Sequence, residues 1–178
     1  FETQAQKSPE YLALNPNGRV PTLVDGDFVL YEAAAITMYL ADEHGLAPAP
    51  ATESRASYYQ WMAHLTNSLQ EALNQWFHPD HFVSGAPAED AFKKNAEQRL
   101  EALWDNLDEA VSSSPYLLGE TYSACDAYLF FLTCWQTRLN KSMIRERPSL
   151  AQFFKTVARR PAVIRALEAE GIRTWYGL

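Results

Sequence analysis

The sequence has no run of basic residues and no long apolar segment. Its 15 Lys and Arg side chains are outnumbered by 22 Asp and Glu, which gives a formal net charge of −7 at pH 7. Proteins that bind nucleic acid or an anionic membrane surface usually carry a basic patch, so we expect neither partner. No stretch approaches the roughly 20 apolar residues of a membrane-spanning helix. We therefore expect no membrane span, and no signal peptide.

Cysteine is also scarce, with only Cys125 and Cys134 in the chain. Both fall in one apolar segment, and if that segment is a helix they lie ~13.5 Å apart along its axis at 1.5 Å per residue. A disulfide needs Cα atoms within about 7 Å, so these two cannot pair with each other. We expect both to be unreactive apolar side chains, in a cytoplasmic protein.

Turn and strand signals alternate through residues 15–31 and predict a β-hairpin. Turn dipeptides occupy residues 15–18, and residues 20–24 form a short apolar run with Pro near its start. The sequence Asp-Gly-Asp at residues 25–27 then predicts a tight reversal, and residues 28–31 form the returning strand.

A helix is predicted to begin directly after this hairpin. Glu32 opens it, and Gly45 provides the stop signal. A strand that runs straight into a helix N-terminus directs several unpaired N–H groups at one spot. Such a spot favours a carboxylate or a phosphate.

The order N-P-x-G-x-V-P-x-L, a turn, and L-x-E-x-x-A-I-x-x-Y-L resembles the glutathione-binding half of the cytosolic glutathione S-transferases. The resemblance implies a cis Val20–Pro21 peptide bond that presents the main chain of Val20 to the cysteinyl backbone of glutathione. It also implies that the helix starting near Glu32 and Ala33 holds the γ-glutamyl carboxylate. Glutathione would be the co-substrate, with no metal cofactor.

The resemblance further implies a β-α-β segment ahead of residue 1. A hairpin with a single helix is marginal in water, so we expect the chain to lack the true N-terminus of the thioredoxin-like half. The family residue that activates the thiol, a Tyr, Ser or Cys, belongs to that segment. The catalytic residue is therefore unknown from this sequence.

Residues 46–53 are rich in Pro and Ala and predict a linker. It would separate a thioredoxin-like glutathione-binding domain at residues 1–45 from an all-helical bundle at residues 54–178. Apolar residues at a spacing of three and four predict helices at 54–77 and from residue 87 to 111. The predicted fold class is α+β.

Ser123 and Asp126 approximate a capping box, in which each side chain meets the free N–H of the other residue. The segment that follows, to Trp135, is apolar on every side, so we expect a central and buried helix. The core helix of the second domain in the family opens with the same signature. We therefore assign Asp126 a structural role, and we predict a closing helix pair at residues 148–159 and 161–170.

Two regions depart from the family pattern, which is otherwise closest to the bacterial beta-type members. Ala33 stands where the family usually has Ser or Thr, so one hydrogen bond of roughly 1 kcal/mol to the γ-glutamyl carboxylate is lost. In the helix at 54–77, members often place Asn, Glu, His and Lys at the positions held here by Ala63, Ser68, Gln70 and Glu71. These departures predict weaker glutathione binding.

Two hypotheses stay open. The first is an enzyme that transfers the thiol of glutathione to a small, hydrophobic electrophile, with Asn67 and Gln70 as candidate substrate-pocket residues. The second is a non-catalytic binding or assembly module with the same fold. Val20, Pro21 and Glu32 favour the enzyme, and the departures favour the module. The family also implies a homodimer.

The four histidines show no metal-ligand spacing. They are His44, His64, His78 and His81. The pair at residues 78 and 81 reads as a solvated turn, so we expect no metal site.

Overall fold

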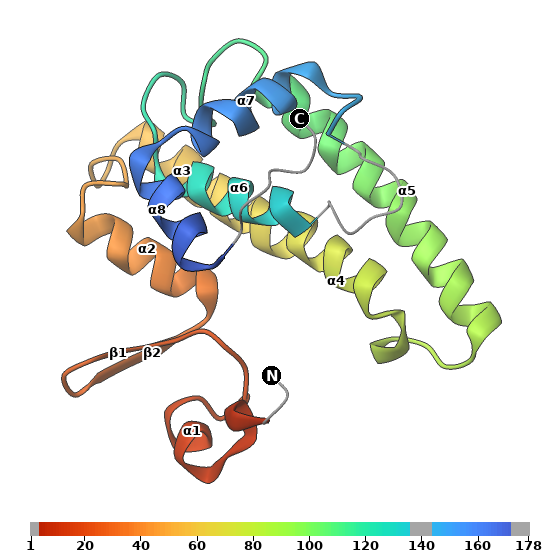
Figure 1. Cartoon of the computed structure of the whole chain (residues 1–178). Coiled ribbons are helices and arrows are strands. Elements are labelled where there is room, and N and C mark those ends of the chain that lie inside the picture. The colour runs from red at the N-terminus through yellow and green to blue at the C-terminus, as the bar shows by residue number, and fades with distance from the viewer. Residues whose placement is uncertain (1–3, 136–143, 172–178) are drawn as a thin grey trace. The chain divides into compact units, whose positions relative to one another are not determined.

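The computed structural model describes residues 4–135 and 144–171 (Figure 1). The chain divides into two compact units, Phe1–Ala47 and Pro48–Leu178. The first contains a two-stranded sheet with short helices, and the second is helical, which confirms the predicted α+β class. No helix of the described residues is both long and apolar enough to cross a bilayer.

The first unit is built around the predicted hairpin. Its strands are β1 (Thr22–Asp25) and β2 (Phe28–Tyr31), which pair antiparallel with Thr22 opposite Tyr31. Gly26 takes a φ of 57° in the reversal, a conformation that suits a residue without a Cβ. The remaining elements of this unit are η1 (Ala5–Lys7), α1 (Pro9–Leu14) and α2 (Ala33–Glu43).

Helix α2 ends where the sequence predicts. Gly45 adopts a φ of 66° just past the helix, and the N–H of Leu46 reaches back to the carbonyl of Ala41 at 2.8 Å. The helix is also tied to the hairpin, because the rings of Phe28 and Tyr39 lie 5.4 Å apart.

The second unit begins with a helical stretch that spans the predicted helix at 54–77 but changes type partway. It consists of α3 (Glu53–His64), the π-helical segment η2 (Leu65–Gln70) and α4 (Glu71–Phe77). Thr52 caps its start by accepting a hydrogen bond from the N–H of Arg55. The hydroxyl of Thr66 donates to the Met62 carbonyl at 2.9 Å, a side-chain bond that competes with regular helix pairing.

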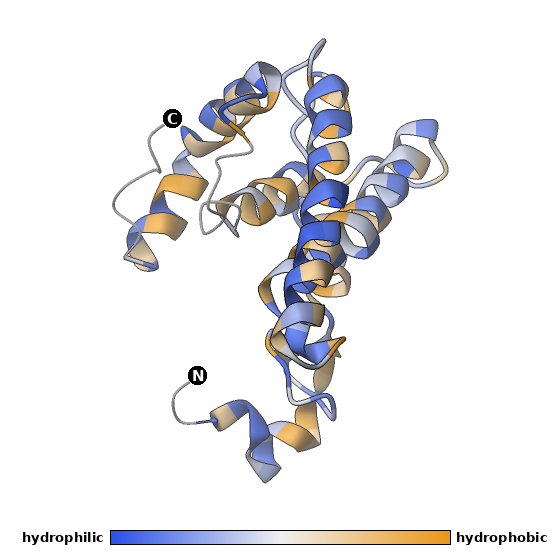
Figure 2. Cartoon of the chain, turned by 90° about the vertical axis from the view of Figure 1, so that its right-hand side faces the viewer, coloured by the Kyte–Doolittle hydropathy of each residue, from blue (hydrophilic) through white to orange (hydrophobic). Residues whose placement is uncertain are grey.

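Further elements of the helical unit follow among the described residues. They are η3 (Pro79–His81), α5 (Ala86–Ala110), α6 (Ala124–Trp135), α7 (Pro148–Ala158) and α8 (Pro161–Ala169). Figure 2 shows apolar and polar residues in bands along the helices, as expected where one face of a helix is buried and the other is exposed to solvent.

Helix α6 carries much of the core of this unit. Leu129 and Leu132 are fully buried, and the ring of Phe130 stacks on that of Phe154 of α7 at 4.8 Å. The prediction that this helix is buried on every side is wrong at Phe131, which is 46% exposed. The apolar sequence of α6 does not show which of its faces other elements cover, because that depends on how the helices pack.

Asp126 holds the start of α6 in a different way from the predicted capping box. Its carboxylate accepts from the N–H of Ser123 at 2.7 Å, which is the expected half of the box. The other half is wrong, because the Ser123 hydroxyl bonds to the same carboxylate, and the Asp126 N–H is directed to the Ser123 carbonyl. The second carboxylate oxygen accepts from Leu117 N–H at 2.8 Å. Burial raises the pKa of Asp126, and these hydrogen bonds partly oppose that rise.

Helix α7 is anchored to α5 by acidic side chains. Arg147, 7% exposed, lies 2.7 Å from both Glu101 Oε2 and Asp105 Oδ1. One turn further along α5, Asp108 accepts from the N–H of Leu150 at 2.7 Å and so caps α7 from another helix. The chain entering α7 is thus fixed by side chains of α5 that lie 42 and 46 residues earlier in the sequence.

Replacing Arg147 by Ala should lower the free energy of unfolding by about 2 kcal/mol. Loss of one partner of a buried ion pair leaves uncompensated charge, and the partial exposure of the two carboxylates reduces that effect. Urea unfolding monitored by circular dichroism measures the change. The matched control is Arg159→Ala, an exposed Arg at the end of α7, which should leave stability nearly unchanged. Equal effects of the two substitutions would contradict this role for Arg147.

Candidate functional site

Asn15 organises the loop that leads into β1. It is only 3% exposed, and its side-chain amide donates to the Arg19 carbonyl at 2.7 Å and to Thr22 Oγ1 at 3.3 Å. Its side-chain oxygen accepts from the N–H of Asn17 at 3.1 Å. A buried Asn with both ends of its amide paired fixes the path of the chain around it.

Tyr11 of α1 reinforces this loop. Its hydroxyl donates to the Arg19 carbonyl at 2.8 Å and lies 2.9 Å from Thr22 Oγ1. The carbonyl before Val20 therefore has two donors. The Val20–Pro21 peptide bond is cis, which confirms the expectation from the resemblance, and the Val20 side chain is 50% exposed.

The hairpin register brings the first-unit candidates to one place. Because Thr22 pairs with Tyr31, the next residues outward, Pro21 and Glu32, lie at the same open end of the hairpin. Val20, which precedes Pro21, and Ala33, which follows Glu32, are the next residues beyond this end. Residues that are separated in sequence by the whole hairpin thus share one end of it.

The N-terminus of α2 begins at this end. Glu32 takes a φ of 76° and ψ of 114°, unusual for a residue with a Cβ, and its carbonyl accepts the first helical hydrogen bond, from Ile36. The N–H groups of Ala33, Ala34 and Ala35 precede that bond. Glu32 makes no side-chain cap, and its side chain is exposed. Within the part of the chain that the structure describes, these three donors are free to meet an anion.

Asn67 and Gln70 belong to the second unit, on the π-helical segment η2. Asn67 is exposed, whereas the half-buried Gln70 accepts a hydrogen bond from the Tyr128 hydroxyl at 2.6 Å. The side-chain oxygen of Gln70 is thus engaged within the helical unit. A π-helical turn inside an α-helix often accompanies a functional site.

The two cysteines form no disulfide with each other, as the sequence predicts. Burial raises the pKa of Cys125 to about 12 and that of Cys134 to about 11. The Cys125 thiol donates to the Tyr58 carbonyl. A thiol with so high a pKa is a poor nucleophile at neutral pH, so neither side chain is suited to covalent chemistry.

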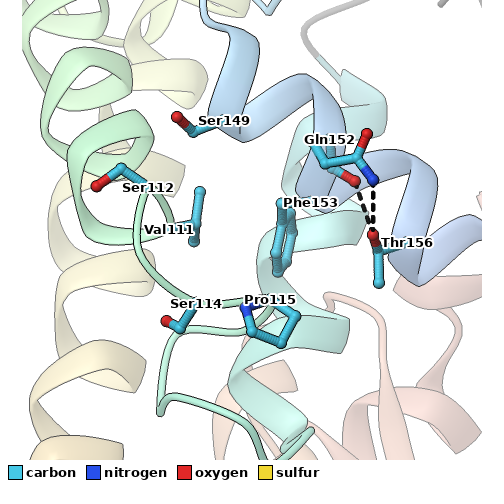
Figure 3. A pocket seen from close by; sticks show the side chains of 8 residues that line it. All are labelled: Val111, Ser112, Ser114, Pro115, Ser149, Gln152, Phe153 and Thr156. Carbon is cyan, nitrogen blue, oxygen red and sulfur yellow. Dashed lines mark hydrogen bonds between the residues drawn. The ribbon is translucent and has the colours of Figure 1, made fainter.

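The second unit also contains a cavity of about 280 Å³ next to α7 (Figure 3). Three of its hydroxyl groups donate to nearby backbone carbonyls: Ser112 to Glu109, Ser114 to Tyr116 and Thr156 to Gln152. No side chain that lines it is charged at neutral pH, so it offers no acid, base or ion pair. The lining residues are Val111, Ser112, Ser114, Pro115, Ser149, Gln152, Phe153 and Thr156.

Sequence reasoning missed Asn15 and Tyr11 as organisers of the candidate site. The sequence pattern at Asn15 predicts only a turn dipeptide. The available signal is that Asn before a turn commonly hydrogen-bonds the backbone a few residues on. Tyr11 carries no such signal, because its partners Arg19 and Thr22 lie 8 and 11 positions further along the chain.

Comparison with known proteins identifies the family. Residues 1–42 match the profile of the "Glutathione S-transferase, N-terminal domain", and residues 69–161 match the "Glutathione S-transferase, C-terminal domain". Glutathione S-transferase GstA of Escherichia coli O157:H7 is 31% identical over 97% of this chain and 84% of its own length. The chain belongs to the glutathione S-transferase family.

Solved structures of bacterial relatives agree. BphK, a bacterial glutathione S-transferase in a ternary complex, is 32% identical with a TM-score of 0.83, over 94% of this chain and 84% of its own. A glutathione transferase homologue from Sulfitobacter, with bound glutathione, is 26% identical with a TM-score of 0.82, over 97% of this chain and 84% of its own. The relationship to bacterial beta-type members expected from the sequence is thereby supported.

His64, at the end of α3, predicts a pH dependence of stability. Burial lowers its pKa from 6.5, its Nε2 is buried with no hydrogen-bond partner among the described residues, and its ring meets that of Trp61 edge-on. Because the folded state disfavours the charged ring, His64 should stabilise the fold above pH 6.5. That contribution should be lost as the pH falls from 6.5 through the lowered pKa.

Urea unfolding at a series of pH values between 8 and 5 (roughly the range in which His titrates) tests this. His64→Gln should show a smaller loss of stability on acidification than the native chain. His44→Gln, which removes an exposed His of the first unit, should retain the native pH dependence. The assignment fails if His64→Gln and the native chain lose stability in parallel.

Proposed function

We propose that this protein binds glutathione at the open end of the hairpin and transfers its thiol to a small, hydrophobic electrophile. The observation that carries the proposal is the juxtaposition of the cis Val20–Pro21 bond with the unpaired N-terminus of α2. Membership of the glutathione S-transferase family supports it, as does the glutathione bound to the Sulfitobacter homologue.

The γ-glutamyl end of glutathione carries both an ammonium and a carboxylate. In our proposal the carboxylate accepts hydrogen bonds from the first N–H groups of α2, beginning with Ala33, where the helix dipole also favours negative charge. The exposed carboxylate of Glu32 faces the ammonium. The two charges of the ligand thus meet groups of opposite sign at adjacent residues.

The middle of the tripeptide pairs with main chain. Val20 lies outside the two β-strands, so its backbone groups are available to an extended peptide, as in strand addition. Asn15 and Tyr11 fix the Arg19 carbonyl beside it and so orient this edge. Pre-organisation of this kind lowers the entropy lost on binding.

The reactive species is the glutathione thiolate. Its sulfur forms a bond to an electrophilic carbon while the leaving group departs with its electron pair, and the thiol proton passes to solvent. Hydrogen bonds and helix dipoles that lower the thiol pKa raise the fraction of thiolate at working pH. The cysteines of the chain play no part, since burial raises their pKa values.

The alternative, a non-catalytic module with this fold, rests on Ala33 and on the engagement of Gln70 by Tyr128. GstA and BphK are both named as glutathione S-transferases, which favours the enzyme. We further propose a homodimeric and cytoplasmic protein, the state typical of the family, and the lack of a disulfide between Cys125 and Cys134 suits a reducing compartment.

Glutathione titration of the full-length protein, followed by a conjugation assay with an aryl halide, tests the proposal. We expect binding with a dissociation constant of about 1 mM or lower, equivalent to at least about 4 kcal/mol, and release of halide that depends on both substrates. Binding without conjugation would favour the module. No binding at millimolar glutathione would reject the glutathione site itself.

Replacing Ala33 by Ser should strengthen glutathione binding about fivefold. The new hydroxyl would add one hydrogen bond worth about 1 kcal/mol to the γ-glutamyl carboxylate. The matched control is Ala34→Ser, one residue further along the same helix, where the side chain turns by about 100°. Isothermal titration calorimetry compares the three proteins. Equal affinities for both variants would mean that position 33 does not face the carboxylate.

A further inference from the structure

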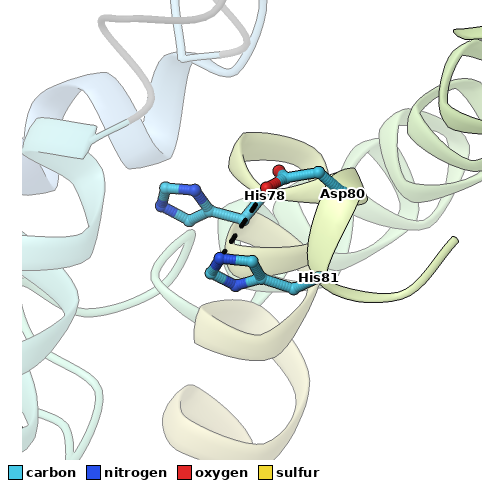
Figure 4. Close-up of side chains that lie close together, drawn as sticks. All are labelled: His78, Asp80 and His81. Atoms are coloured by element: carbon cyan, nitrogen blue, oxygen red, sulfur yellow. Dashed lines mark ion pairs between the residues drawn. The ribbon is translucent and has the colours of Figure 1, made fainter. Parts of the chain in front are cut away.

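The turn after α4 brings three potential metal ligands together. His78 ends α4, and Pro79–His81 form the 3₁₀-helical turn η3. In a 3₁₀ helix, residues three apart eclipse one another. The rings of His78 and His81 accordingly stack, with centroids 4.9 Å apart and planes at 11° (Figure 4).

Asp80 completes the group. Its Oδ2 lies 3.8 Å from Nε2 of His81, and one ligand atom from each of the three side chains lies within 4.8 Å of the others. All three side chains are exposed. In a tetrahedral zinc site, ligand atoms ~2.1 Å from the ion lie ~3.4 Å from one another. A small rotation of the exposed side chains would bring the three ligand atoms from within 4.8 Å of one another to this shorter spacing.

The backbone beneath these side chains is held in place. The N–H of His78 bonds to the Asn74 carbonyl, and the N–H of His81 bonds to the His78 carbonyl. Immediately after the turn, Phe82 stacks on Phe92 of α5 at 5.3 Å. The exposed side chains can thus rotate, whereas the backbone that carries them is fixed. A fixed backbone limits the entropy lost on coordination.

We propose that His78, Asp80 and His81 form a surface site for a divalent transition-metal ion, with Zn²⁺ as the probe. Two imidazoles and one carboxylate suit zinc or copper rather than Mg²⁺ or Ca²⁺, which prefer oxygen ligands. Three protein ligands leave a fourth position open to water or to a group from another molecule. The sequence predicts only a solvated turn here, and the convergence of the three side chains is the reason to revise that prediction.

Zinc titration of the tag-free, full-length protein by isothermal titration calorimetry tests the site. We expect one-to-one binding, weaker at lower pH because protons compete for the ring nitrogens. His78→Ala and His81→Ala should each weaken binding at least ~10-fold, since even residues that only support a ligand commonly contribute that much. The control His44→Ala should bind as the native chain does.

Nuclear magnetic resonance of the histidine rings gives a readout that needs no variant. Zinc should shift the ring nitrogens of His78 and His81 in the native protein and leave those of His44 and His64 in place. The proposal is overturned if native protein does not bind zinc, if zinc shifts other rings instead, or if the double variant His78→Ala, His81→Ala binds zinc as tightly as the native chain.

Discussion

Buried backbone groups must find hydrogen-bond partners, and in this protein polar side chains supply them where the chain changes direction. Asn15 does so before β1, Asp126 before α6, and Asp108 at the start of α7. Each holds a segment that local sequence alone leaves free to take several paths. The geometry of the candidate site depends on the first of these, because Asn15 fixes the loop that presents Val20.

The elements with strong local signals were predictable from the sequence. Gly and Asp at the reversal set the hairpin, and Gly45 and Pro79 set the ends of α2 and α4. The segment η2 was not predictable, because a π-helical turn leaves the apolar spacing of its neighbours nearly intact. Exposure of Phe131 was not predictable either, since it depends on which helices lie alongside α6 and not on the sequence of α6 itself.

The candidate site was predictable only in part, for a similar reason. Glu32 and Pro21 follow from a motif, and the register of the hairpin brings them to one end. The roles of Tyr11 and Asn15 arise from contacts across a loop, and the meeting of His78 with Asp80 and His81 arises from the tight pitch of η3. The sequence shows which side chains are present, whereas the fold determines which of them come together.

The π-helical segment is a place where the second unit can tolerate a change in chain length. A π turn holds one more residue than the α turn it replaces, and each residue advances an α-helix by about 100°. Loss of a single residue between Leu65 and Gln70 could therefore be absorbed by conversion to regular α-helix, with the buried faces of α3 and α4 kept in phase. The same deletion within α5 would turn one half of its apolar stripe toward solvent. Insertions and deletions that arise during divergence should therefore be tolerated at η2 more readily than in its neighbours.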